Sequence, residues 1–76
     1  MITLEMLKHR FAYHKPDKQK AERHERVRKA CHLAAIEVVS LTDPSWEQTN
    51  ALNKLEEAMF WANAAIAREI EVSEKR

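Results

Sequence analysis

The chain contains no glycine in its 76 residues and only two prolines, Pro16 and Pro44. Tight turns between β-strands depend heavily on glycine, because glycine takes positive φ angles without a steric cost. Long helices joined by few turns need no such residue, and a charged fraction of 33% is typical of helices with a solvent-facing side. The sequence therefore predicts an all-α fold.

Capping residues predict where the first two helices begin. Thr3 can cap a short helix over residues 4–11, and Asp17 can cap a long helix over residues 18–41. The proline before Asp17 disfavours helical geometry at the residue that precedes it, so residues 13–15 are expected to form a loop. The first helix is too short to be stable by itself.

The second proline marks the turn between the two long helices. Asp43 is a favourable capping residue, and Pro44 suits the first position of a helix, where its missing N–H costs nothing. We therefore predict a third helix over residues 44–70 that folds back on the second as an antiparallel hairpin. Residues 72–76 are expected to be a frayed tail of a single domain that spans residues 1–76.

Apolar residues recur at spacings of three and four in both long helices, which predicts two stripes that pack on each other. The stripe of the second helix is Val27, Ala30 or Cys31, Ala34, Val38 and Leu41. The stripe of the third helix is Leu52, Leu55, Met59, Ala62 and Ile66. Further apolar residues of the third helix make its apolar face wider than one neighbouring helix can cover: Ala51, Ala58, Phe60, Trp61 and Ala65. We therefore predict that copies of the chain assemble into a compact homo-oligomer.

Basic residues are concentrated near the N-terminus. Residues 8–29 hold nine of the 13 basic residues and three acidic residues, a net charge of +6, whereas the rest of the chain carries −5. The positive electrostatic potential around residues 8–29 would attract an anionic partner. A solvated helix face is the alternative explanation for the same pattern.

The sequence lacks the motifs of an enzyme or a metal site. A Gly-rich phosphate loop is impossible without glycine, and Glu56 and Glu57 are adjacent, so they point in different directions on a helix. The four histidines lack the spacing of metal ligands. The single cysteine, Cys31, excludes an internal disulfide and is expected to be a buried structural residue. We expect no catalytic activity, no metal and no cofactor.

Nothing at the N-terminus has the basic, apolar and small-residue order of a signal peptide, and no apolar run reaches the roughly 20 residues that span a bilayer. We therefore expect a cytoplasmic protein with no membrane partner.

Five side chains are candidates for contacting an anionic ligand. Tyr13 lies in the predicted loop beside basic residues, which suits the stacking of a base, although it could instead pack on the hairpin. Arg26, Arg28 and Lys29 can bind phosphate or can be mere solvated charges. Arg68 follows an alanine-rich helix face, and its position near a helix C-terminus is equally explained by the helix dipole.

Three segments of the sequence resemble the phage anti-CBASS sponge family: residues 10–14 (RFAYH), 27–30 (VRKA) and 55–68 (LEEAMFWANAAIAR). The last segment is the specific part of the resemblance. A related sponge family directed against Thoeris immunity has a similar helical hairpin. The resemblance implies a hexamer of helical hairpins that sequesters cyclic oligonucleotide immune signals in the cytoplasm of an infected bacterial host, without degrading them.

The resemblance also implies two kinds of binding site between protomers. In the first, Tyr13 stacks on a base of a cyclic dinucleotide, such as cyclic GMP-AMP. A basic residue of the second helix holds phosphate there, and the candidates are Arg28, which we favour, Arg26 and Lys29; His14 is assigned to the same site. In the second, Arg68 contacts the phosphates of a cyclic trinucleotide. Duplex DNA is not expected to bind.

Two alternatives to the sponge are left open by the residues themselves. One is a helical nucleic-acid-binding protein that uses residues 8–29, and it predicts binding that weakens steeply with salt. The other is a purely structural oligomeric module that binds no small ligand.

Overall fold

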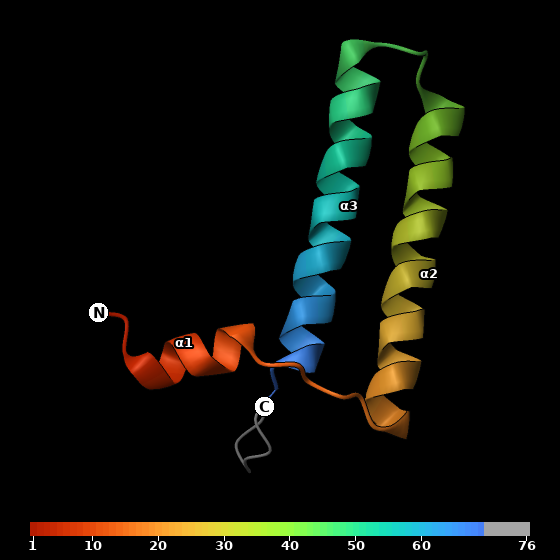
Figure 1. The fold of residues 1–76 in the computed structure, drawn as a ribbon. Helices are drawn as coiled ribbons and strands as arrows, with labels where there is room; N and C mark the ends of the chain where they lie inside the picture. The colour runs from red at the N-terminus through yellow and green to blue at the C-terminus, as the bar shows by residue number, and fades with distance from the viewer. Residues whose placement is uncertain (70–76) are drawn as a thin grey trace.

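The computed structural model describes residues 1–69, and in this part of the chain all regular structure is helical (Figure 1). The helices are α1 (Leu4–Phe11), α2 (Lys18–Leu41) and α3 (Trp46–Ala67). α2 and α3 lie side by side as an antiparallel hairpin, and α1 projects sideways from the open end of the hairpin (Figure 1). The predicted all-α fold with a short helix before a hairpin is confirmed.

The predicted caps of the first two helices are present. The backbone N–H of Met6 donates to Thr3 Oγ1 at 3.1 Å, and that of Lys20 donates to Asp17 Oδ1 at 2.8 Å. Each bond satisfies one of the N–H groups that have no partner within the first turn of a helix. Both helices therefore begin at the residues that their caps predict.

The predicted start of the third helix is wrong by two residues. α3 begins at Trp46, and Ser45 is its cap, since Ser45 Oγ accepts from the N–H of Gln48 at 3.0 Å. The Gln48 side chain also donates to Thr42 Oγ1 at 2.9 Å, which ties the helix to the end of α2. Pro44 lies in this turn and not in the helix.

The predicted end of the third helix is also too late. α3 ends at Ala67, with Arg68 as the capping residue, whereas the prediction continued to residue 70. The predicted frayed tail, residues 72–76, lies outside the described residues.

The two predicted stripes form the seam between α2 and α3. Within residues 1–69 only Ile66 is buried, at 9% exposure. The rest of the α3 stripe is half-buried, as are four residues of the α2 stripe: Val27, Cys31, Ala34 and Val38. Of the alternatives Ala30 and Cys31, Cys31 lies in the seam and Ala30 is exposed. Leu41 is exposed, contrary to the prediction, and Cys31 is half-buried where a buried residue was expected.

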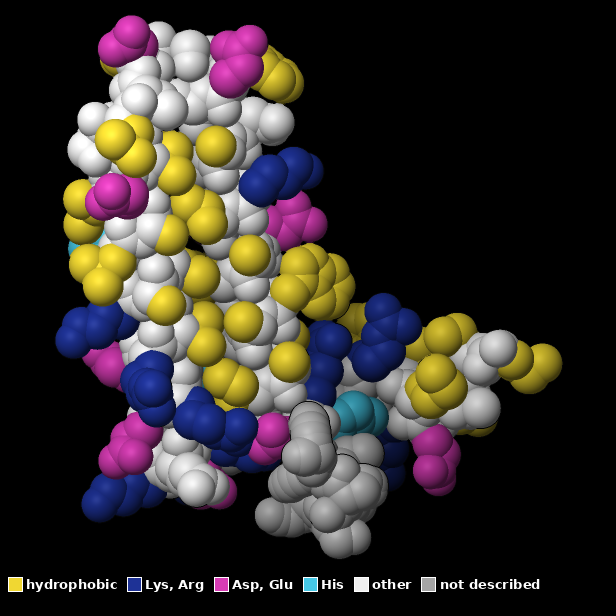
Figure 2. Space-filling view, turned by 180° about the vertical axis from the view of Figure 1, so that it is seen from behind, with side chains coloured by type: hydrophobic (Ala, Val, Ile, Leu, Met, Phe, Trp, Pro, Cys, Tyr) yellow, Lys and Arg dark blue, Asp and Glu magenta, His cyan; other side chains and the backbone are white. Residues whose placement is uncertain are grey.

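Large apolar side chains outside the seam remain in contact with water in a single chain. Trp61 is 62% exposed and Phe60 58%, and α1 exposes Leu4 and Phe11 almost fully. Figure 2 shows hydrophobic side chains along much of the hairpin face, above the charged side chains at its lower end. One buried side chain is too small a core to stabilise a domain, so these faces require a further surface to cover them.

No helix in the described part of the chain has the length and apolar character needed to cross a lipid bilayer.

Candidate functional site

Tyr13 lies in the loop between α1 and α2 with 84% of its surface exposed. The Nε2 atom of the next residue, His14, donates to the carbonyl of His9 at 2.8 Å, and the two imidazole rings meet edge to face. This bond holds the end of α1 close to the loop. The alternative that Tyr13 packs on its own hairpin is therefore wrong for a single chain, and its ring is accessible for stacking.

Arg68 lies at the C-terminal end of α3, where hydrogen bonds fix its backbone on both sides. Its N–H donates to the carbonyl of Ala64 at 2.9 Å, and its carbonyl accepts from His9 Nε2 at 3.0 Å. Its half-buried side chain forms no ion pair with any described residue. The guanidinium of Arg68 is thus available to an anion.

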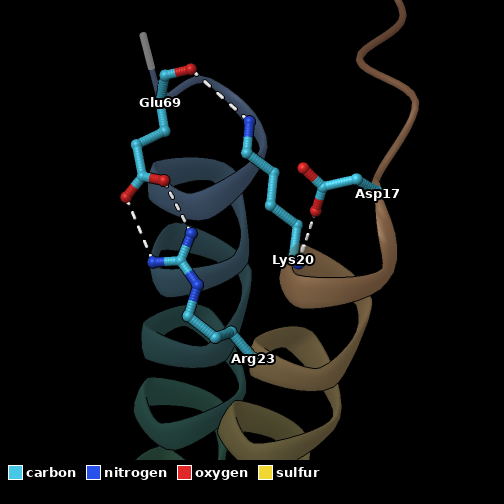
Figure 3. Close-up of polar contacts among 4 residues, drawn as sticks. All are labelled: Asp17, Lys20, Arg23 and Glu69. Carbon is cyan, nitrogen blue, oxygen red and sulfur yellow. Dashed lines mark hydrogen bonds and ion pairs between the residues drawn. The ribbon is translucent and has the colours of Figure 1, made fainter. Parts of the chain in front are cut away.

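Glu69, which follows Arg68, is bound by two basic residues of α2 (Figure 3). The guanidinium of Arg23 donates from both terminal nitrogens to the Glu69 carboxylate, at 2.6 and 3.1 Å. Lys20 Nζ donates to the Glu69 backbone carbonyl at 3.5 Å. These contacts join the start of α2 to the end of α3.

The Arg23–Glu69 ion pair connects α2 to the end of α3, and its closest N···O distance is 2.6 Å. Its hydrogen bonds, with the negative charges of Glu69 and Asp17, raise the pKa of Arg23 above its ordinary value, against the opposing effect of burial. A bidentate arginine–carboxylate pair has a fixed geometry that a single lysine contact lacks. The pair is therefore suited to hold the backbone at Glu69 in a fixed position relative to α2.

Arg28 lies further along α2, at a shallow groove of about 220 Å³ between the two long helices. The groove has a mainly apolar lining: Cys31, His32, Ala35, Leu52, Leu55, Glu56 and Met59. The Nη2 atom of Arg28 donates to Glu25 Oε1 at 2.9 Å, so a phosphate would compete with this exposed carboxylate for the guanidinium. Exposed pairs of this kind are weak enough for such competition.

Arg26 and Lys29 are exposed on α2, and neither forms an ion pair with a residue within the described range. Neither lines the groove at Arg28. Figure 2 shows most of the visible Lys and Arg side chains over the lower half of the hairpin and over α1. This half of the molecule is the basic surface that the charge of residues 8–29 predicts.

The structure brings some of the predicted site residues together and separates others. The bonds of His14 to His9 and of His9 to Arg68 link the Tyr13 loop to the end of α3. Arg28, by contrast, lies about 15 Å along the axis of α2 from its first residue, Lys18, at 1.5 Å per residue.

The sequence did not single out three residues that organise this end of the molecule: His9, Arg23 and Glu69. In the sequence, His9 is one of four histidines without the spacing of metal ligands, and Arg23 is one of nine basic residues in residues 8–29. The described residues contain no cluster of three His, Cys, Asp or Glu side chains that could hold a metal ion.

Comparison with known proteins identifies the family. The family described as "Acb2/Tad1, hairpin domain" matches residues 5–67, which is most of the chain and includes all three helices almost completely. The chain belongs to the Acb2/Tad1 hairpin family. No curated protein and no solved structure gave a significant match.

Membership of this family confirms the resemblance found in the sequence at the level of the anti-CBASS and anti-Thoeris sponges together. The matched range includes Tyr13, His14, Arg26, Arg28 and Lys29 and ends one residue before Arg68. The match therefore covers the dinucleotide residues proposed from the sequence and the helix α3, which ends directly before Arg68.

Proposed function

We propose that the protein is a phage anti-CBASS sponge that binds cyclic dinucleotides and cyclic trinucleotides and releases them unaltered. It acts in the cytoplasm of the infected bacterial host, where sequestration of the signal prevents activation of CBASS effectors. The family membership of residues 5–67 is the observation that carries this proposal. The exposed ring of Tyr13 and the unpaired guanidinium of Arg68 among the described residues supply the contacts that such ligands require.

We further propose that the binding sites form between copies of the chain in a homohexamer. Tyr13 lies in the loop before α2, whereas Arg28 lies about 15 Å along α2 from its first residue, so the two side chains act on one small ligand when they come from different copies. A cyclic ligand with repeated phosphates is well matched by the same basic residue from symmetry-related chains. Assembly would also cover the apolar faces that the single chain leaves exposed.

Folding is expected to depend on assembly, because a chain with one buried side chain among those described would gain further apolar burial from neighbouring copies. Tenfold dilution should lower Tm by roughly 5 °C. Thermal melts at several concentrations, with mass from light scattering, test this expectation. A monomeric mass with a Tm independent of concentration would contradict it.

The function is tested by calorimetric titration of the oligomer with cyclic GMP-AMP and, separately, with a cyclic trinucleotide. The expected result is tight binding of both, with each ligand recovered chemically intact after the complex is heated. Sequestering a dilute signal requires nanomolar affinity, which corresponds to about −12 kcal/mol. Recovery of a linearised ligand would instead identify a degrading enzyme, and no heat from either ligand would favour the purely structural module.

Nucleic-acid binding is the second candidate, because Arg26 and Lys29 are exposed within a segment of net charge +6. It predicts affinity for duplex DNA that falls steeply between about 50 and 200 mM salt, since each phosphate contact releases counterions. The sponge predicts no such binding. Fluorescence anisotropy with a labelled duplex at both salt concentrations separates the two functions.

A further inference from the structure

The C-terminal end of α3 is fastened at two consecutive residues, and this fastening involves none of the residues assigned above to ligand contact except Arg68 itself. The carbonyl of Arg68 accepts from His9 Nε2 of α1, and the carboxylate of Glu69 accepts the fork of Arg23 from α2 (Figure 3). Three separate parts of the chain therefore meet at one turn of backbone.

A helix end needs such contacts if a side chain on it is to be held in place. The last carbonyls of a helix have no partner within it, and terminal turns fray. α3 ends at Ala67, so Arg68 is already outside the regular helix. An arginine at a frayed end would lose conformational entropy on binding a ligand, whereas one that is already positioned loses less.

The charge of Glu69 poses a second problem. A carboxylate beside Arg68 would by itself repel a phosphate, as would the partial negative charge at the C-terminal end of α3. The paired guanidinium of Arg23 offsets the charge of Glu69. The ion pair thus allows a carboxylate to serve as an anchor at an anion site.

We propose that Arg23, Glu69 and His9 are positioning residues that hold Arg68 for contact with the phosphates of a cyclic trinucleotide. Arg23 acts through Glu69, and His9 acts on the backbone of Arg68. None of the three touches the ligand. This inference rests on the proposed function, since it assigns a role toward the trinucleotide site.

Glu69→Ala gives the sharpest test, because charge and positioning predict opposite results. Removing a negative charge beside a phosphate site should strengthen binding if charge alone matters. Positioning predicts that binding weakens by about tenfold, the effect of losing one charge-assisted anchor. Calorimetric titration with a cyclic trinucleotide measures the change. Unchanged or tighter binding with an intact oligomer overturns the role of Glu69 and Arg23.

The role of His9 is tested by comparing His9→Ala with His9→Gln. The alanine variant removes the donor to the Arg68 carbonyl and should lose about tenfold in trinucleotide affinity, whereas glutamine retains an N–H donor and should recover most of it. Unchanged affinity of His9→Ala, or an equal loss in both variants, would overturn the positioning role. Lys54→Ala is the control, since it removes a cation from an exposed pair with Glu57 and should change nothing.

Each variant is also titrated with cyclic GMP-AMP, and the mass of its oligomer is measured by light scattering. Loss of trinucleotide binding alone, at unchanged mass, supports positioning, and loss of both ligands or of the oligomer assigns these residues to folding instead. If the unaltered protein binds no trinucleotide, the proposed function fails together with this inference. If it binds and only Arg68→Ala loses affinity, the positioning inference fails alone.

Discussion

Tyr13→Ala is expected to weaken the binding of cyclic GMP-AMP by about 10- to 100-fold, because stacking on an aromatic ring contributes about 1 to 3 kcal/mol per base. The ring is 84% exposed in one chain, so its removal takes away ligand contact and no intramolecular packing. Stability should therefore change by less than about 0.5 kcal/mol, as for other surface substitutions. Calorimetric titration and thermal melts of the same sample measure both quantities.

Two comparisons make this prediction specific. Tyr13→Phe keeps a ring and should retain most of the affinity, and binding of a cyclic trinucleotide to Tyr13→Ala should be unchanged. Loss of both ligands by Tyr13→Ala, at unchanged oligomer mass, would show that the two sites are not separate. An unaffected dinucleotide affinity would remove Tyr13 from the site altogether.

Local chemistry explains which parts of the fold were predictable from the sequence. Thr3 and Asp17 cap the helices directly after them through bonds that span three residues, so the signal and its effect lie in the same few positions. The seam of α2 and α3 follows from spacings of three and four for a similar reason. Both features depend on residues that are neighbours on one helix.

The start of α3 was mispredicted because two capping patterns compete in the same turn. Asp43 before Pro44 is a favourable sequence for a helix start, but Ser45 is also a good cap and lies two residues later. The bond from the Gln48 side chain to Thr42 stabilises the later start. This contact joins α3 to the residue that follows α2, so the capping propensities of Asp43 and Pro44 alone could not reveal it.

The arrangement of the candidate site was not predictable, because its contacts join distant parts of the sequence. His9 and Arg68 are 59 positions apart, and Arg23 and Glu69 are 46 apart. No helical periodicity connects them. Tyr13 and Arg68 were singled out by residue type and by family resemblance, whereas the residues that hold them in place became visible only in three dimensions.

The near absence of a core has a consequence for the proposed sponge function. Ile66 is the one buried residue among those described, so in the proposed hexamer the hairpin would bury its exposed apolar faces on assembly. A site that is built between copies then exists only when the oligomer does. Mutations on the apolar faces should consequently reduce the binding of both ligands, whereas mutations of Tyr13 or Arg68 should each affect one.

Arg68→Ala is the converse of the tyrosine substitution and should have the larger effect. Hydrogen bonds that involve a charged group contribute about 1.5 to 3 kcal/mol each, and a symmetric site would use Arg68 from several copies at once. We therefore expect trinucleotide affinity to fall by at least about 100-fold. The side chain has no ion pair with a described residue, so the loss should leave the fold and the oligomer mass unchanged.

Arg68→Lys distinguishes charge from geometry at this position. Lysine keeps the positive charge but lacks the planar fork that binds two phosphate oxygens together, so it should recover only part of the lost affinity. The affinity for cyclic GMP-AMP should be the same in the unaltered protein, in Arg68→Ala and in Arg68→Lys. If Arg68→Ala instead binds the trinucleotide as tightly as the unaltered chain, Arg68 serves only the C-terminal end of α3, where a cation favours the helix dipole. The trinucleotide site would then have to be sought elsewhere on the basic half of the molecule.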